Sequence, residues 1–274
     1  METLKTSVII STYNQPKWLE NVLWGYAAQT EKSFEIIIAD DGSGEDTKQV
    51  VERFKKDSEL EIVHVWHEDD GFQKTKILNK AIEASSSEYL IFTDGDCIPR
   101  NDFVATHLKL SRKNCFLSGG YFKLPEDISN IITKETIKSQ QCFKLDWLLK
   151  HGLKKTFKTN KLTAFGLRAW FLNTFTPTKA TFDGMNVSGW KSDIITVNGF
   201  DERMQYGGED RELGERLMNS GVKFIQVRYS AICLHLYHER PYKNEAALAK
   251  NKKIREETKK NKSVYTPYGI VKSG

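Results

Sequence analysis

The sequence lacks close cysteine pairs, long apolar runs and a leader pattern. Its four cysteines, Cys97, Cys115, Cys142 and Cys233, are too far apart for a Cys-x-x-Cys pair, which argues against a zinc knuckle and favours reduced thiols. No apolar run approaches the roughly 20 residues of a membrane span, and the N-terminus has no charged-then-apolar segment. We therefore expect a cytoplasmic protein, soluble or peripheral on the inner face of the membrane.

A strong charge of one sign is also lacking. The formal net charge is only +5 over 274 residues, so we expect no nucleic-acid partner. A mild positive excess suits phosphorylated substrates or an anionic membrane surface equally well. The hydrophobic content of 39% is that of a globular protein, and the length fits one large α/β domain with or without a tail.

Short β-branched runs alternate with helical patterns over roughly the first hundred residues. The runs lie at residues 7–11, 35–39, 61–66 and 89–93, and amphipathic stretches separate them. This alternation predicts a mainly parallel sheet with helices on both faces. Three acidic turns follow strands, and in a parallel sheet they would meet at one edge. These turns are Asp40-Asp41, Asp69-Asp70 and Asp94-Gly95-Asp96.

Each acidic turn has a structural and a functional interpretation. Asp and Gly are common turn residues, whereas paired carboxylates are also hard ligands for a divalent cation. Glu209 and Asp210 begin a predicted helix, where the helix dipole stabilises carboxylates and where an ionised one could act as a general base. His235 and His238 follow a late strand and are either structural or metal ligands.

A basic and aromatic stretch interrupts the second half of the chain. Between about residues 138 and 175 the only acidic residue is Asp146. The stretch predicts a helical subdomain with a solvated basic face, or else a surface for a lipid-linked or polyanionic acceptor or an anionic membrane. From residue 243 onward the Lys-, Glu- and Asn-rich sequence indicates a surface helix or a loose tail.

Taken together, these motifs resemble glycosyltransferase family 2, with a galactosyltransferase-type C-terminal half like that of bacterial chondroitin-synthase-like enzymes. The resemblance covers roughly residues 5–242, apart from the basic aromatic stretch. It rests on Ser7-Val8-Ile9-Ile10-Ser11-Thr12-Tyr13-Asn14, Ala39-Asp40-Asp41-Gly42-Ser43, Phe92-Thr93-Asp94-Gly95-Asp96-Cys97-Ile98-Pro99, Asn186-Val187-Ser188, Asn198-Gly199-Phe200-Asp201-Glu202 and Gly207-Gly208-Glu209-Asp210-Arg211-Glu212-Leu213.

The resemblance implies a GT-A fold, which is a Rossmann-like mixed sheet in a single catalytic domain. On this basis residues 1–242 form the domain, and residues 243–274 form the tail. The domain divides into a nucleotide-binding half (1–120), a helical basic and aromatic insertion (121–180), and a half for the acceptor and catalytic base (181–242).

The family also implies roles for particular residues. By resemblance, Thr12, Tyr13 and Asn14 line the nucleoside pocket, and Asp40 or Asp41 pairs with uracil. The other roles complete the site. Asp94 and Gly95 approach the ribose, and Asp94 also lies near the metal. Asp96 binds Mn²⁺ or Mg²⁺ directly, together with His238 or else His235. Asp210 is the catalytic base, and Glu209 and Trp190 lie near the acceptor or donor sugar.

The chain departs from the family pattern at two positions. Tyr206 stands where relatives often carry Trp, which affects the acceptor side. Gln73 replaces the usual Arg after Gly-Phe, so Lys74 or Lys76 is expected to carry the phosphate contact.

The resulting prediction is an inverting, metal-dependent glycosyltransferase. It would move a sugar from a UDP-sugar to a hydroxyl of a glycan or lipid-linked acceptor, in bacterial surface polysaccharide synthesis. A non-catalytic nucleotide-sugar or polysaccharide-binding module is the alternative. A nucleotidyltransferase would need a Gly-rich basic phosphate loop after the first strand, and Thr12-Tyr13-Asn14-Gln15 is not one.

Overall fold

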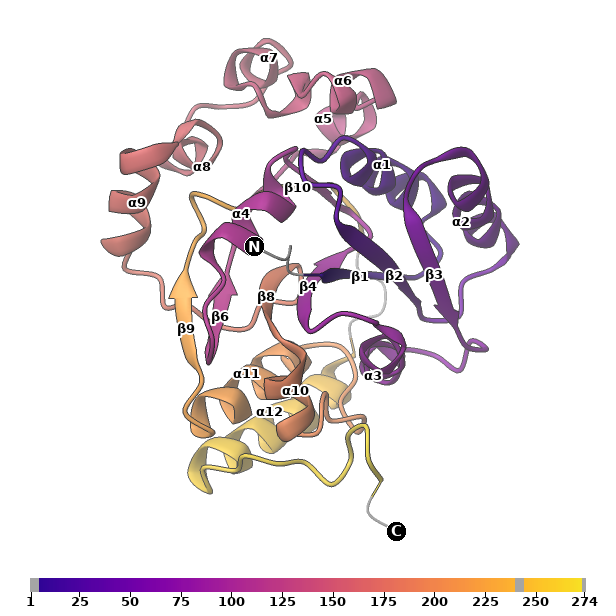
Figure 1. Ribbon diagram of the computed structural model, residues 1–274, viewed down its shortest axis with the longest axis vertical. Helices are drawn as coiled ribbons and strands as arrows, with labels where there is room; N and C mark the ends of the chain where they lie inside the picture. The colour runs from indigo at the N-terminus through magenta and orange to yellow at the C-terminus, as the bar shows by residue number, and fades with distance from the viewer. Residues whose placement is uncertain (1–4, 240–243, 273–274) are drawn as a thin grey trace.

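The central feature of the fold is a seven-stranded sheet with strand order β3-β2-β1-β4-β8-β6-β9 (Figure 1). A computed structural model describes residues 5–239 and 244–272. Only β8 runs antiparallel to its neighbours, which confirms a mixed, mainly parallel sheet. The strands are β1 (Thr6–Thr12), β2 (Phe34–Asp40), β3 (Glu61–Trp66), β4 (Tyr89–Asp94), β6 (Cys115–Ser118), β8 (Asn186–Trp190) and β9 (Lys223–Gln226).

Strand β1 is buried along its whole length because helices cover both faces of the sheet. Val8 and Ile10 face a core shared with α1 (Pro16–Ala27), α2 (Glu45–Asp57) and α4 (Phe103–Leu110). Ile9 faces the opposite core, which α3 (Lys74–Ala84), α10 (Lys191–Thr196) and α11 (Glu209–Asn219) complete. A strand enclosed on both sides is apolar at nearly every position, as residues 8–10 are.

A small second sheet joins segments that are far apart in the chain. It has the order β5 (Cys97–Pro99), β10 (Ile232–His235) and β7 (Gly120–Lys123). Cys97 pairs with His235, and the amide of Leu236 donates to the carbonyl of Asp96 over 2.9 Å. This sheet therefore brings the Asp-x-Asp turn to the histidines near the end of the chain.

The segment between β7 and β8 is helical, as the sequence predicts, but it begins later. Residues 121–123 belong to β7, so the first helix starts at Glu126. Figure 1 shows these helices projecting from the sheet on the side of α1 and α4. They are α5 (Glu126–Asn130), α6 (Lys134–Lys138), α7 (Leu145–Lys150), α8 (Asn160–Thr163) and α9 (Gly166–Thr174), with short 3-10 turns at Gln141–Phe143 and Phe157–Thr159.

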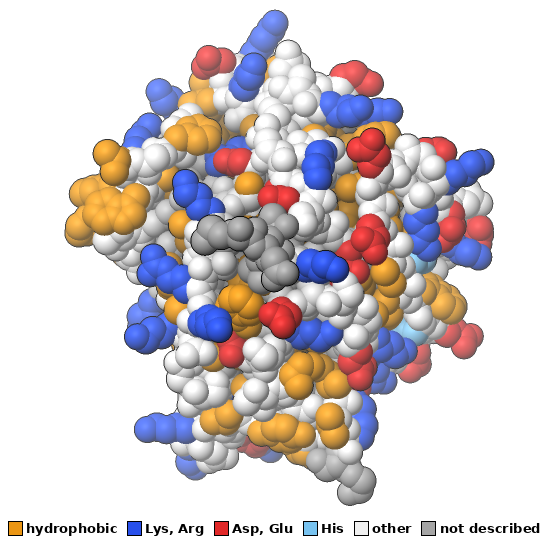
Figure 2. Space-filling view, in the orientation of Figure 1, with side chains coloured by type: hydrophobic (Ala, Val, Ile, Leu, Met, Phe, Trp, Pro, Cys, Tyr) orange, Lys and Arg blue, Asp and Glu red, His pale blue; other side chains and the backbone are white. Residues whose placement is uncertain are grey.

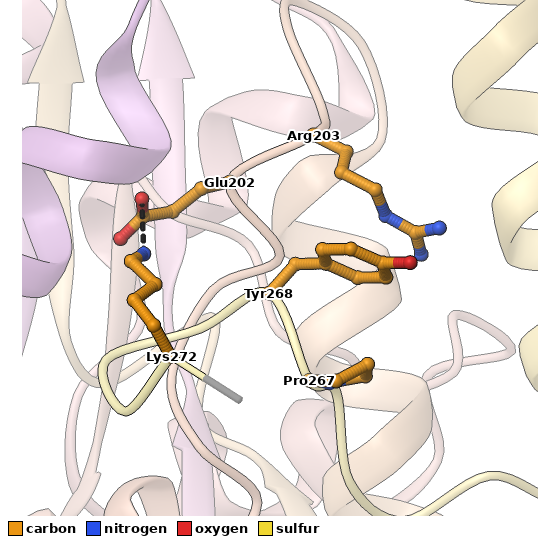
Figure 3. A pocket seen from close by; sticks show the side chains of 5 residues that line it. All are labelled: Glu202, Arg203, Pro267, Tyr268 and Lys272. Atoms are coloured by element: carbon orange, nitrogen blue, oxygen red, sulfur yellow. Dashed lines mark ion pairs between the residues drawn. The ribbon is translucent and has the colours of Figure 1, made fainter. Parts of the chain in front are cut away.

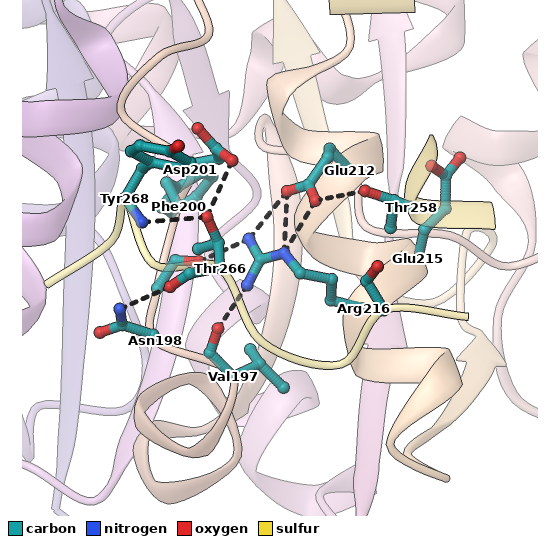
Figure 4. Close-up of polar contacts among 12 residues, drawn as sticks. Val197, Asn198, Phe200, Asp201, Glu212, Glu215, Arg216, Thr258, Thr266 and Tyr268 are labelled. Carbon is teal, nitrogen blue, oxygen red and sulfur yellow. Dashed lines mark hydrogen bonds and ion pairs between the residues drawn. The ribbon is translucent and has the colours of Figure 1, made fainter. Parts of the chain in front are cut away.

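Residues 245–260 form a helix, one of the two alternatives expected for the C-terminal segment, and this helix packs against the domain. Helix α12 (Glu245–Lys260) lies beside α11 (Figure 1). The buried Arg216 pairs with Glu212, which also accepts a hydrogen bond from Thr258 of α12 (Figure 4). Thr266, further along, donates to Asp201 over 2.8 Å. Thr258 and Thr266 therefore bind this segment to the preceding part of the domain.

A cavity of about 370 Å³ lies over this C-terminal segment (Figure 3). Its charged residues are already paired, since Lys272 lies 2.5 Å from Glu202 and Arg203 lies over the ring of Tyr268. None of the residues lining this cavity belongs to the predicted site; they are Glu202, Arg203, Pro267, Tyr268 and Lys272. Within residues 5–239 and 244–272, no helix has the length and apolarity needed to cross a bilayer.

Candidate active site

The C-terminal ends of the parallel strands β1, β2 and β4 are polar and lie side by side. We call this edge of the sheet the active edge. Thr12 is in register with Asp40, and Ser11 is in register with Asp94. A Cβ on Gly95 would lie 3.0 Å from the hydroxyl of Thr12, so only glycine fits there comfortably. The strand order reverses between β1 and β4, which is where open α/β sheets bind ligands.

At one end of the active edge, histidines of the β3 segment hold the first acidic turn. Nε2 of His64 lies 2.9 Å from Asp40, and Nε2 of His67 lies 2.8 Å from Asp41. Asp40 also accepts from the amide of Ser43 and has no exposed surface. Asp41 keeps a little exposure, and its burial raises its pKa. Of the two carboxylates, Asp41 is the one that a ligand can reach.

The loop after β1 forms hydrogen bonds with both the turn that follows β2 and the Asp69-Asp70 turn. The Tyr13 hydroxyl donates to Asp69 over 2.8 Å, which brings the second acidic turn to the same edge as predicted. Asn14 has a φ of 46°, a conformation that Asn tolerates better than most residues. In it, the Asn14 amide donates to Ser43 and its side-chain oxygen accepts from Gly44. Tyr13 remains 44% exposed.

Lys74, not Lys76, reaches the active edge. Nζ of Lys74 lies 2.7 Å from Asp94 Oδ1, which also accepts from the Ser11 hydroxyl. Burial on its own lowers the pKa of Lys74, but the negative charges of Asp94, Glu209 and Asp210 outweigh it and raise the pKa. Lys76 lies about 200° further round helix α3 and forms no ion pair within the described residues.

Asp96 faces two histidine rings. Nε2 of His238 lies 3.0 Å and Nε2 of His235 lies 4.0 Å from Asp96 Oδ2. Nδ1 of His235 lies 2.8 Å from the backbone carbonyl of Leu236, and Nδ1 of His238 lies 2.8 Å from that of Glu239. Because a carbonyl only accepts, Nδ1 of each ring carries a proton, and Nε2 faces Asp96. Two imidazole nitrogens and a carboxylate oxygen at these distances are a donor set that fits a divalent metal.

The sequence left His235 and His238 as alternatives, and the structure places both beside Asp96. Cys97 lies in one group with Asp96 and His235, and its Sγ–H donates to Asp96 Oδ1 over 3.3 Å. Burial raises the pKa of Cys97, so it remains a thiol and a poor ligand. Lys74 and Ser11 both bind Oδ1 of Asp94. The metal contact of Asp94 stays a prediction.

On the other side, the start of α11 presents Glu209 and Asp210. Gly207, at a φ of 107°, donates its amide to Glu209 over 2.8 Å. Burial, with the charge of Asp210 adding to it and that of Lys74 opposing it, raises the pKa of Glu209 to about 7. Asp210 Oδ2 accepts from the amide of Gly184 over 3.3 Å. The two carboxylates therefore share the active edge with Lys74.

Asp183 is a site residue that sequence reasoning missed. Its burial and the neighbouring charge of Asp210 raise its pKa to about 6. It lies just before β8, and because β8 is antiparallel to β4 the beginning of β8 is at the active edge. The Asp183-Gly184 pair was the available signal, but the direction of the following strand cannot be read from the sequence.

The same strand direction places Trp190 away from the active edge. Asn186 pairs with Thr93 near the active edge, whereas Trp190 pairs with Tyr89 at the beginning of β4. Four positions along a strand amount to about 13 Å. The indole Nε1 donates to the carbonyl of Arg112 over 2.8 Å, so Trp190 closes the opposite end of the sheet.

Comparisons with known proteins identify the family. A model described as glycosyl transferase family 2 matches residues 7–171, more than half of the chain. The chain belongs to glycosyltransferase family 2. A second model, described as the N-terminal domain of galactosyltransferase, matches residues 174–239 of this glycosyltransferase. Both halves of the resemblance seen in the sequence are thereby confirmed.

Its relatives include two bacterial chondroitin synthases. That of Escherichia coli is 29% identical, over 90% of this chain and 37% of the relative. That of Pasteurella multocida is 28% identical, over 86% of this chain and 25% of the relative. A validoxylamine A glucosyltransferase of Streptomyces hygroscopicus is also 28% identical, over 82% of this chain and 54% of the relative. The chain therefore spans only part of the length of these relatives.

Solved structures show the expected GT-A fold. A mannosyltransferase from Pyrobaculum calidifontis, in complex with GDP-Man and Mn²⁺, matches with a TM-score of 0.57 at 20% identity, over 86% of this chain and 58% of the other. TarS 1-349 of S. aureus in complex with UDP-GlcNAc matches with the same TM-score at 17% identity, over 87% and 60%.

Proposed function

We propose that this glycosyltransferase transfers a sugar from a UDP-sugar to a hydroxyl of a glycan or lipid-linked acceptor, with inversion and with Mn²⁺ or Mg²⁺. We place the reaction in the cytoplasm, in bacterial surface polysaccharide synthesis. The observation that carries the proposal is the pair of histidine Nε2 atoms directed at Asp96, on the domain that also presents Asp210 beside Lys74. The chondroitin synthases and the UDP-GlcNAc and Mn²⁺ complexes among similar proteins support it.

The nucleoside would lie at the ends of β1 and β2. Within the described residues, the buried hydroxyl of Thr12 has no hydrogen-bond partner. Tyr13 is exposed beside it, and Asn14 holds the loop in place. We assign the nucleobase contact to Asp41, whose carboxylate would accept the imide N–H of uracil. Asp40 is too deeply buried for this role.

Asp96, His238 and His235 would hold the divalent cation. When bound, the cation supplies positive charge that stabilises the diphosphate leaving group. Lys74 adds a second positive charge, and its ion pair with Asp94 fixes the position of the ammonium group. The chain thus offers a cation on the protein as well as a site for one from solution.

Asp210 would act as the general base. Its carboxylate would accept the proton of the acceptor hydroxyl as the oxygen attacks the anomeric carbon in line. A single displacement inverts the anomeric configuration, so an α-linked donor gives a β-glycoside and needs no covalent enzyme intermediate. Glu209, with a pKa of about 7, is partly protonated at neutral pH and can donate a hydrogen bond to a sugar hydroxyl.

A panel of nucleotide-sugars tests this function. The thermal shift of the purified chain is measured with each donor, with Mn²⁺ and with EDTA, and release of free nucleotide is followed in parallel. We expect UDP-sugars to stabilise the protein only with Mn²⁺ and to be hydrolysed slowly. Stabilisation by GDP-sugars alone would contradict the donor assignment. Stabilisation without nucleotide release over many hours would favour a non-catalytic binding module.

A further inference from the structure

The insertion presents an unusual row of large apolar side chains to solvent. Figure 2 shows hydrophobic side chains gathered at the edge of the molecule where Figure 1 draws α9. These side chains come from α9 and the segments on either side of it. Their exposed fractions are 70% for Phe157, 58% for Phe165, 85% for Leu167, 61% for Trp170, 54% for Phe171 and 65% for Phe175.

Helix α9 is apolar on its outer face as well as on its inner one. Leu167, Trp170 and Phe171 follow helical spacing on one exposed face, and Phe175 packs on Phe171 with ring centroids 4.5 Å apart. Ala169 is buried on the inner side. At about 200 Å² per aromatic side chain, the exposed aromatic residues present roughly 600 Å². A patch of this size is at the upper end of what a monomer leaves in water.

Positive charge surrounds this apolar face. The sequence between Asp146 and Asp183 contains no acidic residue but has seven basic ones. None of the seven forms an ion pair within the described residues, and Lys154, Lys155, Lys158 and Arg168 are exposed. The seven are Lys150, Lys154, Lys155, Lys158, Lys161, Arg168 and Lys179.

The charge decides which partner fits. Two copies of the chain joined through this face would bring like charges together, which is unfavourable. An anionic lipid bilayer would accept both features, since aromatic side chains insert at the level of the headgroups and lysines bind anionic ones. We propose that residues 154–175 form a docking surface that holds the protein peripherally on an anionic bilayer.

The docking surface is joined to the active edge through the small sheet. Nζ of Lys161 on α8 donates to the carbonyl of Tyr121 in β7 over 2.9 Å. Strand β7 pairs with β10, which carries His235. Docking would thus fix the active edge relative to the bilayer. A lipid-linked acceptor would benefit from this, a consequence that rests on the proposed function, whereas docking itself does not.

Vesicle sedimentation tests the proposal without any catalytic readout. The full chain is mixed with vesicles of phosphatidylcholine, alone or with phosphatidylglycerol. We expect binding only to the anionic vesicles and weakening with salt. The triple variant Lys154→Glu, Lys155→Glu, Lys158→Glu should lower the partition coefficient on the order of 100-fold. A matched variant on α12, at the exposed Lys250, Lys253 and Lys260, changes the net charge equally and should bind nearly as well as wild type.

Quenching of tryptophan fluorescence by brominated lipids reports which residue enters the bilayer. We expect quenching to fall sharply in Trp170→Phe and to persist in Trp66→Phe, although Trp66 is also exposed, at 52%. Three results would overturn the proposal. They are no binding to anionic vesicles, equal losses in the two lysine variants, or concentration-dependent self-association through this surface in analytical ultracentrifugation.

Discussion

The two sides of the active edge treat their carboxylates differently. On the nucleotide side, Asp94 is held by an ion pair with Lys74, and histidines hold the Asp40-Asp41 turn. On the α11 side, Asp183 and Glu209 are buried near Asp210, and none of the three forms an ion pair within the described residues. An ion pair fixes the position of a carboxylate, whereas burial beside another acid raises the pKa of Asp183 and Glu209. The first arrangement suits binding, and the second suits proton transfer.

The largest effect is expected from Asp210→Asn. This change removes the proposed proton acceptor and keeps the size of the side chain, so turnover should fall by roughly 10²- to 10⁴-fold. Initial rates of transfer or of UDP release measure this. Asp193→Asn is the matched control, because Asp193 is a partly buried carboxylate on α10, outside the active edge. A wild-type rate in Asp210→Asn would exclude Asp210 as the base.

Lys74→Gln would remove the ammonium group that interacts with both the nucleotide side and the α11 side of the active edge. Asp94 would lose its partner, and Glu209 and Asp210 would lose the nearby positive charge. We expect the free energy of unfolding to fall by about 2–3 kcal/mol, less than for a fully buried pair. Lys76→Gln, on the same helix, should change it by no more than about 0.5 kcal/mol. Equal effects in urea unfolding would show that Lys74 does not connect the two sides.

Glu209→Gln should change how stability depends on pH. The folded-state pKa of Glu209 is about 7 and its ordinary value is 4.5, so the folded protein binds the proton more tightly. The stability that this proton confers is complete below about pH 4.5 and is lost as the pH rises to about 7. Relative to wild type, the variant should gain on the order of 2–3 kcal/mol across this window. Parallel pH profiles of the two unfolding free energies would contradict the raised pKa.

The smallest effect is expected from Trp190→Phe. Loss of the hydrogen bond to the carbonyl of Arg112 should cost about 1 kcal/mol in the free energy of unfolding. The KM for the donor should not change, because Trp190 lies at the opposite end of the sheet. A clear rise in that KM without a loss of stability would place Trp190 near the donor after all.

The sequence allowed the active edge to be predicted where local signals sufficed. Apolar runs marked the parallel strands, and the acidic turns after them had to meet once the strands were parallel. The omission of Asp183 and the unexpected position of Trp190 have one common reason. Each lies at an end of β8, and the direction of β8 is set by its pairing with β4 and β6, which are distant in the chain. No local pattern records that pairing.

Other long-range contacts explain the remaining differences. Three residues at the start of the expected insertion became β7 because β10, more than a hundred residues later, pairs with them. The polar C-terminal segment gave no sign of packing, yet Asn251 donates to the carbonyl of Gln205 and Thr266 donates to Asp201. The buried Ala247 and Ile254 of α12 and the packing of Ile270 against the core add apolar contacts to these hydrogen bonds.

Calorimetry of UDP binding, with Mn²⁺ and with EDTA, tests the division of the active edge most directly. The comparison is between Asp96→Ala and Asp210→Asn. We predict that Asp96→Ala loses the binding that depends on Mn²⁺, because one of the three proposed ligands is gone, whereas Asp210→Asn binds UDP as the wild type does. Unchanged Mn²⁺-dependent binding in Asp96→Ala, or an equal loss in both variants, would contradict a metal-bound nucleotide on one side and a general base on the other.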